Sequence, residues 1–273
     1  MGALGEDGTV EDREEALFAQ HRYFLKDSIR KRIDFSRTDQ SRGIAVPPIE
    51  KPYPADAVRI DLTKPGEWNR IGRIDLATAI GRRRSRRAYL KSPLTLEEIS
   101  FLLWATQGVR GKVLEGHAYR TVPSAGCRHA LETYLAVLQV EGLDSGVYRY
   151  LPLSHQLLFE FSEEGLDAKM VRAAFGQPYP GRAAVTFIWT AIPYRMEWRY
   201  HLAAHKLIAI DVGHVCQNLY LACEAIGAGT CAIAAYDQEA WDRLLRLEGE
   251  EEFVLYLTPV GRVREGESDG IGD

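Results

Sequence analysis

The pattern of apolar and polar positions predicts a helix most clearly after Thr95. This residue can cap the helix while Glu98, three positions on, reaches back in a capping box, and Leu94 and Ile99 form the matching hydrophobic staple. Apolar side chains then recur at helical spacing as far as Gly108, which is expected to end the helix. Both ends of this helix are therefore marked in the sequence.

Similar patterns predict the other elements. Apolar runs rich in β-formers indicate strands at 131–140, 146–150, 156–159, 183–192, 229–234 and 253–260. Helices are indicated at 75–80, 166–175, 201–226 and 237–247, the first ending at Gly81 as a left-handed C-cap and the last capped by Asp237. The 201–226 helix is apolar on more than one face, which is typical of a core or a subunit interface. Helices and strands do not alternate regularly, so the expected fold class is α+β.

Residues 1–66 differ from the rest of the chain. A charged stretch at 11–32 has helical character, and five prolines follow it between positions 47 and 65. Proline disfavours both continuous helix and central strand, so we expect this segment to be an arm laid over a surface. Residues 67–273 are then expected to form one domain with its own core.

The composition excludes some classes of function. The chain has 273 residues, of which 46% are hydrophobic and 26% charged, as is ordinary for a soluble globular protein. Its net charge of -4 argues against a dedicated nucleic-acid or membrane-surface protein, since these usually carry a basic excess. The four cysteines show no Cys-x-x-Cys spacing and are expected to be reduced. No apolar run could span a bilayer and no signal sequence is visible, so a cytoplasmic location is expected.

A local exception to the acidic balance is the basic run that follows Gly81. It extends from Arg82 to Arg87 and contains five arginines around Ser85. Guanidinium groups packed this closely repel one another, and an anion between them would relieve the repulsion through charge-assisted bonds. Phosphate is the obvious candidate, although a solvated basic loop explains the run equally well. A nucleic-acid site is less favoured because no aromatic platform accompanies the run.

Three further motifs could carry chemistry. The first is a segment of small residues, Pro123, Ser124, Ala125 and Gly126. Small side chains let the backbone approach a flat ring closely, although a turn before a strand is the commoner reason for such a segment. The letters of residues 227–232 match a dinucleotide fingerprint, but a helix precedes them and a strand follows, the reverse of what that site requires. His201 and His205 lack the rest of a zinc motif, so no metal site is expected.

Taken in chain order, these segments resemble the nitroreductase-like flavoproteins, and among them the SagB-type dehydrogenases. The pattern Arg-Arg-Ser-x-Arg is matched by residues 83–87, and a helix ending in Leu-Trp-Ala-x-Gln-Gly by residues 103–108. Pro-Ser-Ala-Gly with a nearby Arg-His is matched by residues 123–129. The helix pattern Gly-His-x-x-Gln-Asn-Leu-x-Leu-Ala is matched by residues 213–222, and a closing Pro-Val-Gly-Arg by residues 259–262. Five motifs in the right order make coincidence improbable.

The resemblance implies an α+β homodimer in which a central, mainly antiparallel sheet is flanked by helices. It also implies two FMN sites, each built from both chains, with NAD(P)H as an electron donor. In that picture Arg83 and Arg84 hold the phosphate and ribityl chain, while Ser85 and Arg87 reach the pyrimidine edge of the flavin. The segment 123–126 approaches the ring from the partner subunit. Further implied flavin contacts are a backbone amide near N5 at Ala234 or Ala235, and a second phosphate ligand at Arg262 beside Gly261.

The chain departs from the family pattern at two places. Azoline oxidases of the subgroup have a Lys-Tyr pair where this chain has Arg199 and Tyr200, its candidate catalytic residues, and an arginine stays protonated and is a poor base. Ala234 and Ala235 stand where related nitroreductases often have Glu-Gly, so only backbone contacts can be shared there. The sequence therefore predicts an FMN-dependent oxidoreductase acting on an unidentified small molecule. The alternatives are a dehydrogenase of peptide heterocycles and a non-catalytic protein that binds a phosphorylated ligand.

Overall fold

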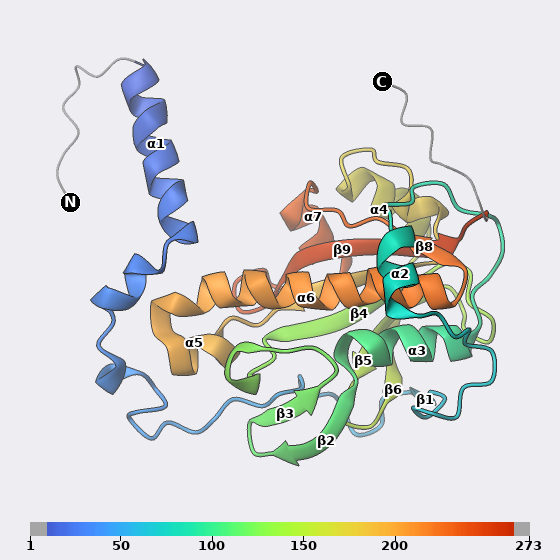
Figure 1. Ribbon diagram of the computed structural model, residues 1–273, viewed down its shortest axis with the longest axis horizontal. Coiled ribbons are helices and arrows are strands. Elements are labelled where there is room, and N and C mark those ends of the chain that lie inside the picture. The colour runs from blue at the N-terminus through green and yellow to red at the C-terminus, as the bar shows by residue number, and fades with distance from the viewer. Residues whose placement is uncertain (1–9, 265–273) are drawn as a thin grey trace.

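The apolar runs form the strands of one antiparallel sheet. In the computed structural model, which describes residues 10–264, the strand order is β1-β6-β5-β4-β7-β9-β8 (Figure 1). The strands are β1 (Arg59–Asp61), β4 (Leu131–Val137), β5 (Gly146–Leu151), β6 (Gln156–Phe161), β7 (Val185–Ala191), β8 (Ala228–Thr230) and β9 (Phe253–Arg262). Every neighbouring pair in this sheet is antiparallel, which confirms the predicted sheet type. A separate hairpin of β2 (Val109–Leu114) and β3 (His117–Arg120) was not indicated by the apolar pattern.

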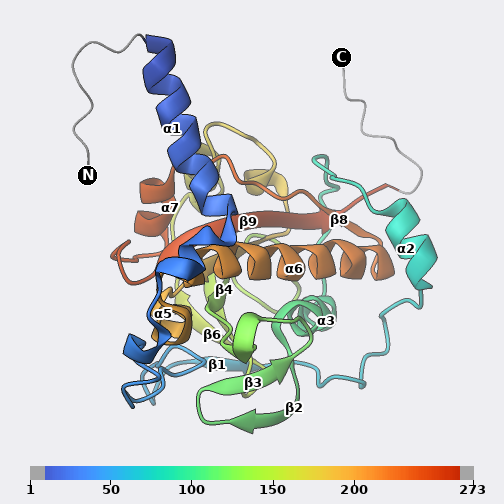
Figure 2. The same ribbon diagram turned by 60° about the vertical axis from the view of Figure 1, so that its left-hand side comes forward.

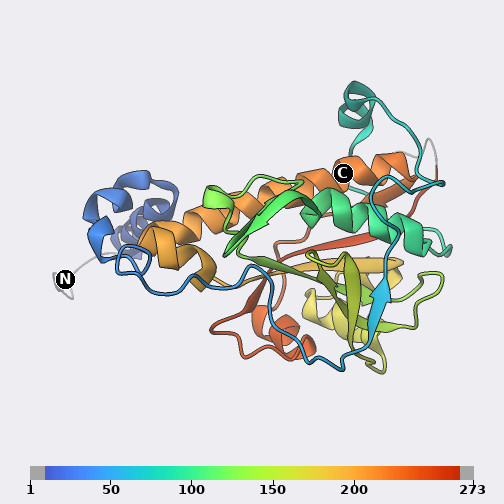
Figure 3. The ribbon, with the colours of Figure 1, turned by 90° about the horizontal axis from the view of Figure 1, so that it is seen from below.

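Helices cover both faces of the sheet, as the view from below shows (Figure 3). The helices α3 (Leu96–Gln107) and α6 (Ala204–Ala225) pack on one face, and α4 (Leu166–Ala173) and α7 (Gln238–Leu244) pack on the other. Each face therefore has its own apolar core, which confirms the α+β class. Among residues 10–264, no helix combines the length and the apolarity needed to cross a membrane.

The helix starts were predicted better than the helix ends. Thr95 accepts from the Glu98 amide and the Glu98 carboxylate accepts from the Thr95 amide, so the capping box of α3 is confirmed. The short helix α2 (Leu76–Arg82) begins near its predicted start, where Asp75 caps it, but runs through Gly81, which does not take a left-handed conformation. The prediction of a C-cap at Gly81 is therefore wrong. The chain leaves α2 in an extended conformation because it goes on to pair with β8.

The long helix predicted at 201–226 is confirmed with a small shift of its start: a 3-10 turn occupies His201–Ala203 and α6 begins at Ala204. A shorter helix that was not predicted, α5 (Tyr194–Tyr200), precedes it. The two helices are separated at His201, whose φ of 52° lies in the left-handed region. This turn places the end of α5 beside the segment of small residues at 123–126.

The N-terminal arm begins with α1 (Val10–Leu25), followed by a 3-10 turn at Asp27–Arg32. Figures 1 and 2 show α1 standing away from the sheet, near the start of α6. One link between them is a hydrogen bond of 2.6 Å from the Lys206 ammonium to the Leu25 carbonyl. Farther along, β1 lies inside the predicted arm and pairs with β6. The arm therefore contributes an edge strand to the main sheet.

Buried arginines hold the proline-rich part of the arm. Arg120 donates to the Ile49 carbonyl at 2.8 Å, and Arg149 donates to the Lys51 carbonyl at 2.8 Å. Arg128 reaches the Pro47 carbonyl at 3.5 Å. All three arginines are buried, and we call them the arm clamp. The clamp fixes the arm through main-chain oxygens, so the segment is packed onto the domain.

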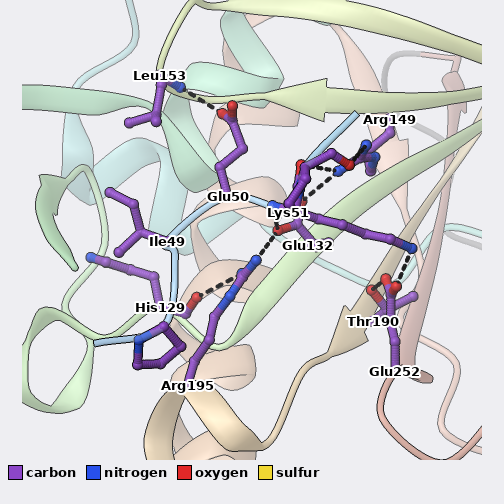
Figure 4. Close-up of polar contacts among 12 residues, drawn as sticks. Ile49, Glu50, Lys51, His129, Glu132, Arg149, Leu153, Thr190, Arg195 and Glu252 are labelled. Carbon is purple, nitrogen blue, oxygen red and sulfur yellow. Dashed lines mark hydrogen bonds and ion pairs between the residues drawn. The ribbon is translucent and has the colours of Figure 1, made fainter. Parts of the chain in front are cut away.

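Glu132 on β4 lies at the centre of the charges around the clamp (Figure 4). Its carboxylate accepts from Arg195 at 2.5 Å and from the Lys51 amide at 2.8 Å, and lies 3.7 Å from Arg149. Burial alone would raise the pKa of Glu132, but the attraction of Arg195 and Arg149 outweighs it and the pKa is lowered. Glu132 is therefore a buried anion that balances two buried cations.

Candidate active site

The basic run leaves α2 as an extended segment along the edge of β8. The Arg86 amide donates to the Thr230 carbonyl at 2.8 Å, and Ser85 bridges to the same residue. Side chains alternate in an extended backbone, so Arg83, Ser85 and Arg87 share one side. The side chain of Arg86 is half-buried and lies against Gly229.

Two tyrosines lie next to the side chains of Arg83, Ser85 and Arg87. The Ser85 hydroxyl lies 3.0 Å from the Tyr220 hydroxyl, and the Arg83 guanidinium lies 5.4 Å from the centre of the Tyr220 ring. Arg87 lies 6.0 Å from the centre of the Tyr179 ring. The Tyr220 hydroxyl also accepts from the Ala232 amide at 2.8 Å. Burial raises the pKa of Tyr220, so its hydroxyl stays protonated and can donate to Ser85.

The charge around the basic run is predominantly positive. Neither Arg83 nor Arg87 has a carboxylate within ion-pair distance among residues 10–264. Glu224 on α6 interacts electrostatically with the run: burial raises its pKa, and four of the arginines oppose that rise. Because Arg83 and Arg87 have no ion-pair partner within residues 10–264, this surface suits a ligand with phosphate-like charge.

The loop after β8 carries Ala234 and Ala235, which are both exposed. Their neighbour Ile233 pairs with Leu257 of β9, and the Ala235 carbonyl accepts from Gln177 at 2.7 Å. The pKa of Arg87 is raised, chiefly by its electrostatic interaction with Cys231 at the start of this loop. The basic run therefore lies beside β8 and the start of the loop that carries Ala234 and Ala235, whose contact with a flavin stays a prediction.

Gly261 and Arg262 lie nearby but are already engaged. Gly261 is paired with Gly229 inside the sheet, and a side chain there would meet the ring of Tyr89 at about 2.9 Å. The Arg262 guanidinium holds both Glu98 oxygens, at 2.6 and 2.7 Å, and also bonds the Ile226 carbonyl. The carboxylate of the capping box is thus the resident partner of Arg262. Its role as a second phosphate ligand stays a prediction.

The segment of small residues lies at a second place, next to the candidate catalytic pair. A β-carbon added to Gly126, whose φ is 59°, would lie 2.6 Å from the Tyr200 hydroxyl and 3.2 Å from Arg199 Nε. Buried Asp211 on α6 interacts with Ser124 and with the Ala125 backbone, and burial raises its pKa. The structure therefore unites Pro123–Gly126 with Arg199 and Tyr200, which the sequence had marked separately.

The two places are separated within one chain. Asp211 interacts with the small-residue segment and Tyr220 contacts the basic run, and both residues lie on helix α6. Nine residues of helix span about 13 Å at 1.5 Å per residue. We call the region of Pro123–Gly126, Arg199 and Tyr200 the glycine half-site, and the region of the basic run and alanine loop the arginine half-site.

Comparison with known proteins decides the family. The family model described as "Nitroreductase family" matches residues 80–262. This chain belongs to the nitroreductase family. The match begins just before the basic run and ends at Arg262, so it includes both half-sites.

Individual relatives support the same assignment. One relative is the Methanocaldococcus jannaschii protein MJ1384, itself provisionally named a nitroreductase. This nitroreductase-family chain is 35% identical to it over 192 residues, and the match covers 70% of this chain and 93% of the relative. It is 28% identical over 153 residues to the trifolitoxin-processing protein TfxB of Rhizobium leguminosarum bv. trifolii, covering 52% of this chain and 40% of TfxB. A solved structure from Ralstonia eutropha, also provisionally named a nitroreductase, matches with a TM-score of 0.62 and 25% identity, covering 80% of this chain and 98% of the other. The predicted fold and family are confirmed, and the likeness to TfxB fits the SagB-type subgroup.

Three residues of the half-sites were missed in the sequence. Tyr220 occupies an unspecified position of the family helix pattern, and Tyr179 and Asp211 lie outside the motifs. Helical spacing could have indicated Asp211, since it is an acidic residue in a mostly apolar helix and such a position suggests a partner. Nothing in the sequence brings Tyr179 near Arg87.

The histidines do not form a metal site. His205 pairs with Glu197 at 2.8 Å, and His201 belongs to the turn before α6. Within the described part of the chain, no three His, Cys, Asp or Glu side chains gather in a way that could hold a metal ion.

Proposed function

We propose that this nitroreductase-family chain is an FMN-dependent oxidoreductase that transfers hydride between NAD(P)H, or another donor, and a small-molecule substrate. The observation that carries the proposal is the arginine half-site. There an extended backbone places Arg83, Ser85 and Arg87 on one side with no carboxylate partner for either arginine among residues 10–264. Such a donor set fits a phosphorylated ligand with a hydrogen-bonding ring edge.

Within the arginine half-site, four residues of the basic run have a binding role and Tyr220 has an orienting role. Arg83 and Arg84 would hold the phosphate and ribityl chain, and Ser85 and Arg87 would reach the pyrimidine edge of the ring. Tyr220 fixes the Ser85 hydroxyl through their 3.0 Å contact. The exposed alanine loop leaves room for a flat ring against backbone amides. When bound, FMN would supply the hydride chemistry, while positive charge at the ring edge favours its reduced, anionic form.

A complete site requires two copies of the chain. Asp211 and Tyr220, which contact the two half-sites, lie about 13 Å apart along α6 by helical rise, and in this proposal the ring is enclosed by one half-site from each chain. In a homodimer related by a two-fold axis, the glycine half-site of one protomer would face the arginine half-site of its partner. This arrangement agrees with the dimer that the family resemblance implied.

The proposal is tested first by colour and reduction. We expect the purified protein to absorb as a flavoprotein or to take up added FMN, and to be bleached by NADH or NADPH without oxygen. A colourless protein that takes up no FMN would contradict it and favour a non-catalytic protein that binds another phosphorylated ligand.

Replacing Arg83 and Arg87 together with alanine is expected to weaken FMN binding by roughly two to four orders of magnitude, because each charge-assisted bond contributes about 1.5–3 kcal/mol. The affinity is measured by titrating apoprotein with FMN and following the quenching of flavin fluorescence. Arg82→Ala is the matched control, since Arg82 is exposed and ends α2 before the extended segment begins. Equal losses in the double variant and the control would place the cofactor elsewhere.

A dehydrogenase of peptide heterocycles is the second candidate. The likeness to TfxB favours it, because that relative is named for processing trifolitoxin. Against azoline oxidation stands Arg199, which cannot accept a proton as a lysine could. Bleaching of the flavin by a heterocycle-bearing peptide, and not by NADH or NADPH, would select this candidate.

A further inference from the structure

A hollow of about 440 Å³ adjoins the glycine half-site. Three parts of the chain form its walls: the N-terminal arm, the β2–β3 hairpin and the segment that runs from Gly126 to Arg128, with the end of α5 beside them. Side chains facing it include those of Gln40, Val46, His117, Tyr119, Cys127 and Arg199. The hollow is therefore continuous with the segment that the proposed function places against the flavin ring.

The arm is a fixed wall of this hollow. The Gln40 amide donates to the Trp198 carbonyl at 2.9 Å, and the Trp198 indole donates to the Ile44 carbonyl at 2.9 Å. Val46 packs against Gly116 so closely that a β-carbon at Gly116 would lie 2.1 Å from it. These contacts join the arm to α5 and to the hairpin, so the hollow has a defined shape before any ligand enters.

Two guanidinium groups border the hollow, and they differ in what they bind. Arg128 is buried and donates to the Arg195, Gly116 and Pro47 carbonyls, with its guanidinium 4.8 Å from the centre of the Trp198 ring. Burial lowers the pKa of Arg128, and the charge of Arg199 lowers it further. The donors of Arg128 are thus committed to the protein.

Arg199 is the uncommitted cation. Its guanidinium lies 5.5 Å from the centre of the Tyr200 ring, and it has no carboxylate within ion-pair distance among residues 10–264. Glu115, the carboxylate that lines the hollow, lies beyond that distance. A guanidinium has five N–H donors in a planar fork that matches a carboxylate. The Arg199 side chain lies beside Gly126, in the segment that the proposed function places against the flavin ring.

We propose that the hollow is the substrate pocket of the glycine half-site, and that Arg199 selects substrates carrying a carboxylate or similar anionic group. This inference rests on the proposed function, because it takes the segment 123–126 to lie against the flavin of the partner protomer. Arg199 then acts as a binding residue that positions the substrate by a bidentate contact. The arm, through Gln40 and Val46, shapes the pocket around that substrate.

The test compares an anionic and a neutral probe of the same shape. The holoenzyme is assayed with 4-nitrobenzoate and with 4-nitrobenzamide, and the ratio of the two kcat/KM values is compared between the unaltered protein, Arg199→Gln and Arg199→Lys. We expect Arg199→Gln to lower the ratio roughly 10- to 100-fold, mainly through the KM of the anion, and Arg199→Lys to restore part of it. The matched control is Arg243→Gln, an exposed arginine on α7 that pairs with Glu239.

A second readout does not depend on turnover. Calorimetric titration of the holoenzyme with benzoate is expected to show binding that Arg199→Gln weakens by a similar factor. Failure of the unaltered holoenzyme to bind benzoate, or an affinity equal in the Gln variant, would overturn the inference. The two proposals can be told apart by how they fail. A protein that takes up no FMN would contradict the proposed function. A yellow protein whose preference for the anionic probe is unchanged in Arg199→Gln would contradict this inference alone.

Discussion

Replacing Glu132 with glutamine is expected to lower the free energy of unfolding by about 3–5 kcal/mol, because it leaves buried Arg195 and Arg149 without their shared counter-charge. Glu132 is itself buried, and its carboxylate also accepts from the Lys51 amide in the arm. The measurement is urea unfolding followed by circular dichroism at neutral pH. The loss should appear as a lower midpoint with little change in slope.

Glu160→Gln is the matched control for this prediction. Glu160 lies 2.8 Å from the same Arg149, but its side chain is 28% exposed, so solvent screens the pair. We expect a loss of about 1 kcal/mol or less. Similar losses in the two variants would show that Glu132 is not the balancing charge described here.

Acidification is expected to destabilise the protein through His129. Burial, followed by the charge of Arg120, lowers the pKa of His129 to about 3 from an ordinary value of 6.5. Between these two values the unfolded chain binds a proton that the folded chain does not. The contribution is therefore fully present above pH 6.5 and is lost as the pH falls, by about 1.4 kcal/mol for each pH unit.

The slope is isolated by comparing variants. His129→Gln keeps an amide that can donate to the Ala118 carbonyl, as the ring nitrogen does at 2.9 Å, but it does not titrate. The unfolding free energy is measured from pH 7 to pH 4.5. Its fall with pH should be less steep in this variant, by the contribution of about one bound proton. Exposed His21→Gln is the control and should keep the original slope. The pKa of His155 is also lowered by burial, so His155 likewise decreases the unfolding free energy as the pH falls. It does so in the unaltered protein and in both variants.

Much of the fold could be predicted because its signals are local. The capping box of α3 and the apolar runs of the main strands depend on neighbours in sequence, and both appear where expected. The β2–β3 hairpin was missed because β2 is mostly exposed and shows no apolar alternation. The short helix α5 was missed because apolar or aromatic and charged residues alternate along Tyr194–Tyr200, which is a strand-like pattern and not a helical one.

For the same reason, only part of the candidate site could be predicted from the sequence. The order of the motifs identified the basic run and Pro123–Gly126, since both are contiguous in sequence. Tyr179 and Tyr220 could not be assigned, because only the folded chain brings them to Arg87 and Ser85. The burial of Arg120 and Arg149 was equally hidden, since arginine is usually an exposed residue and the sequence does not show the carbonyls that satisfy it.

The arm clamp also bears on how freely the arm can change during evolution. The clamp recognises the main-chain oxygens of Pro47, Ile49 and Lys51, and every amino acid carries such an oxygen. The neighbouring prolines suit this arrangement because they bring no N–H group that would need a partner. The clamp contacts therefore do not depend on which side chains these three positions carry, whereas the contacts of the Lys51 ammonium with Glu252 and of Val46 with Gly116 do depend on the side chain. Because Gln40 and Val46 line the hollow beside Arg199, a change of either side chain would reshape the pocket while the clamp contacts remain.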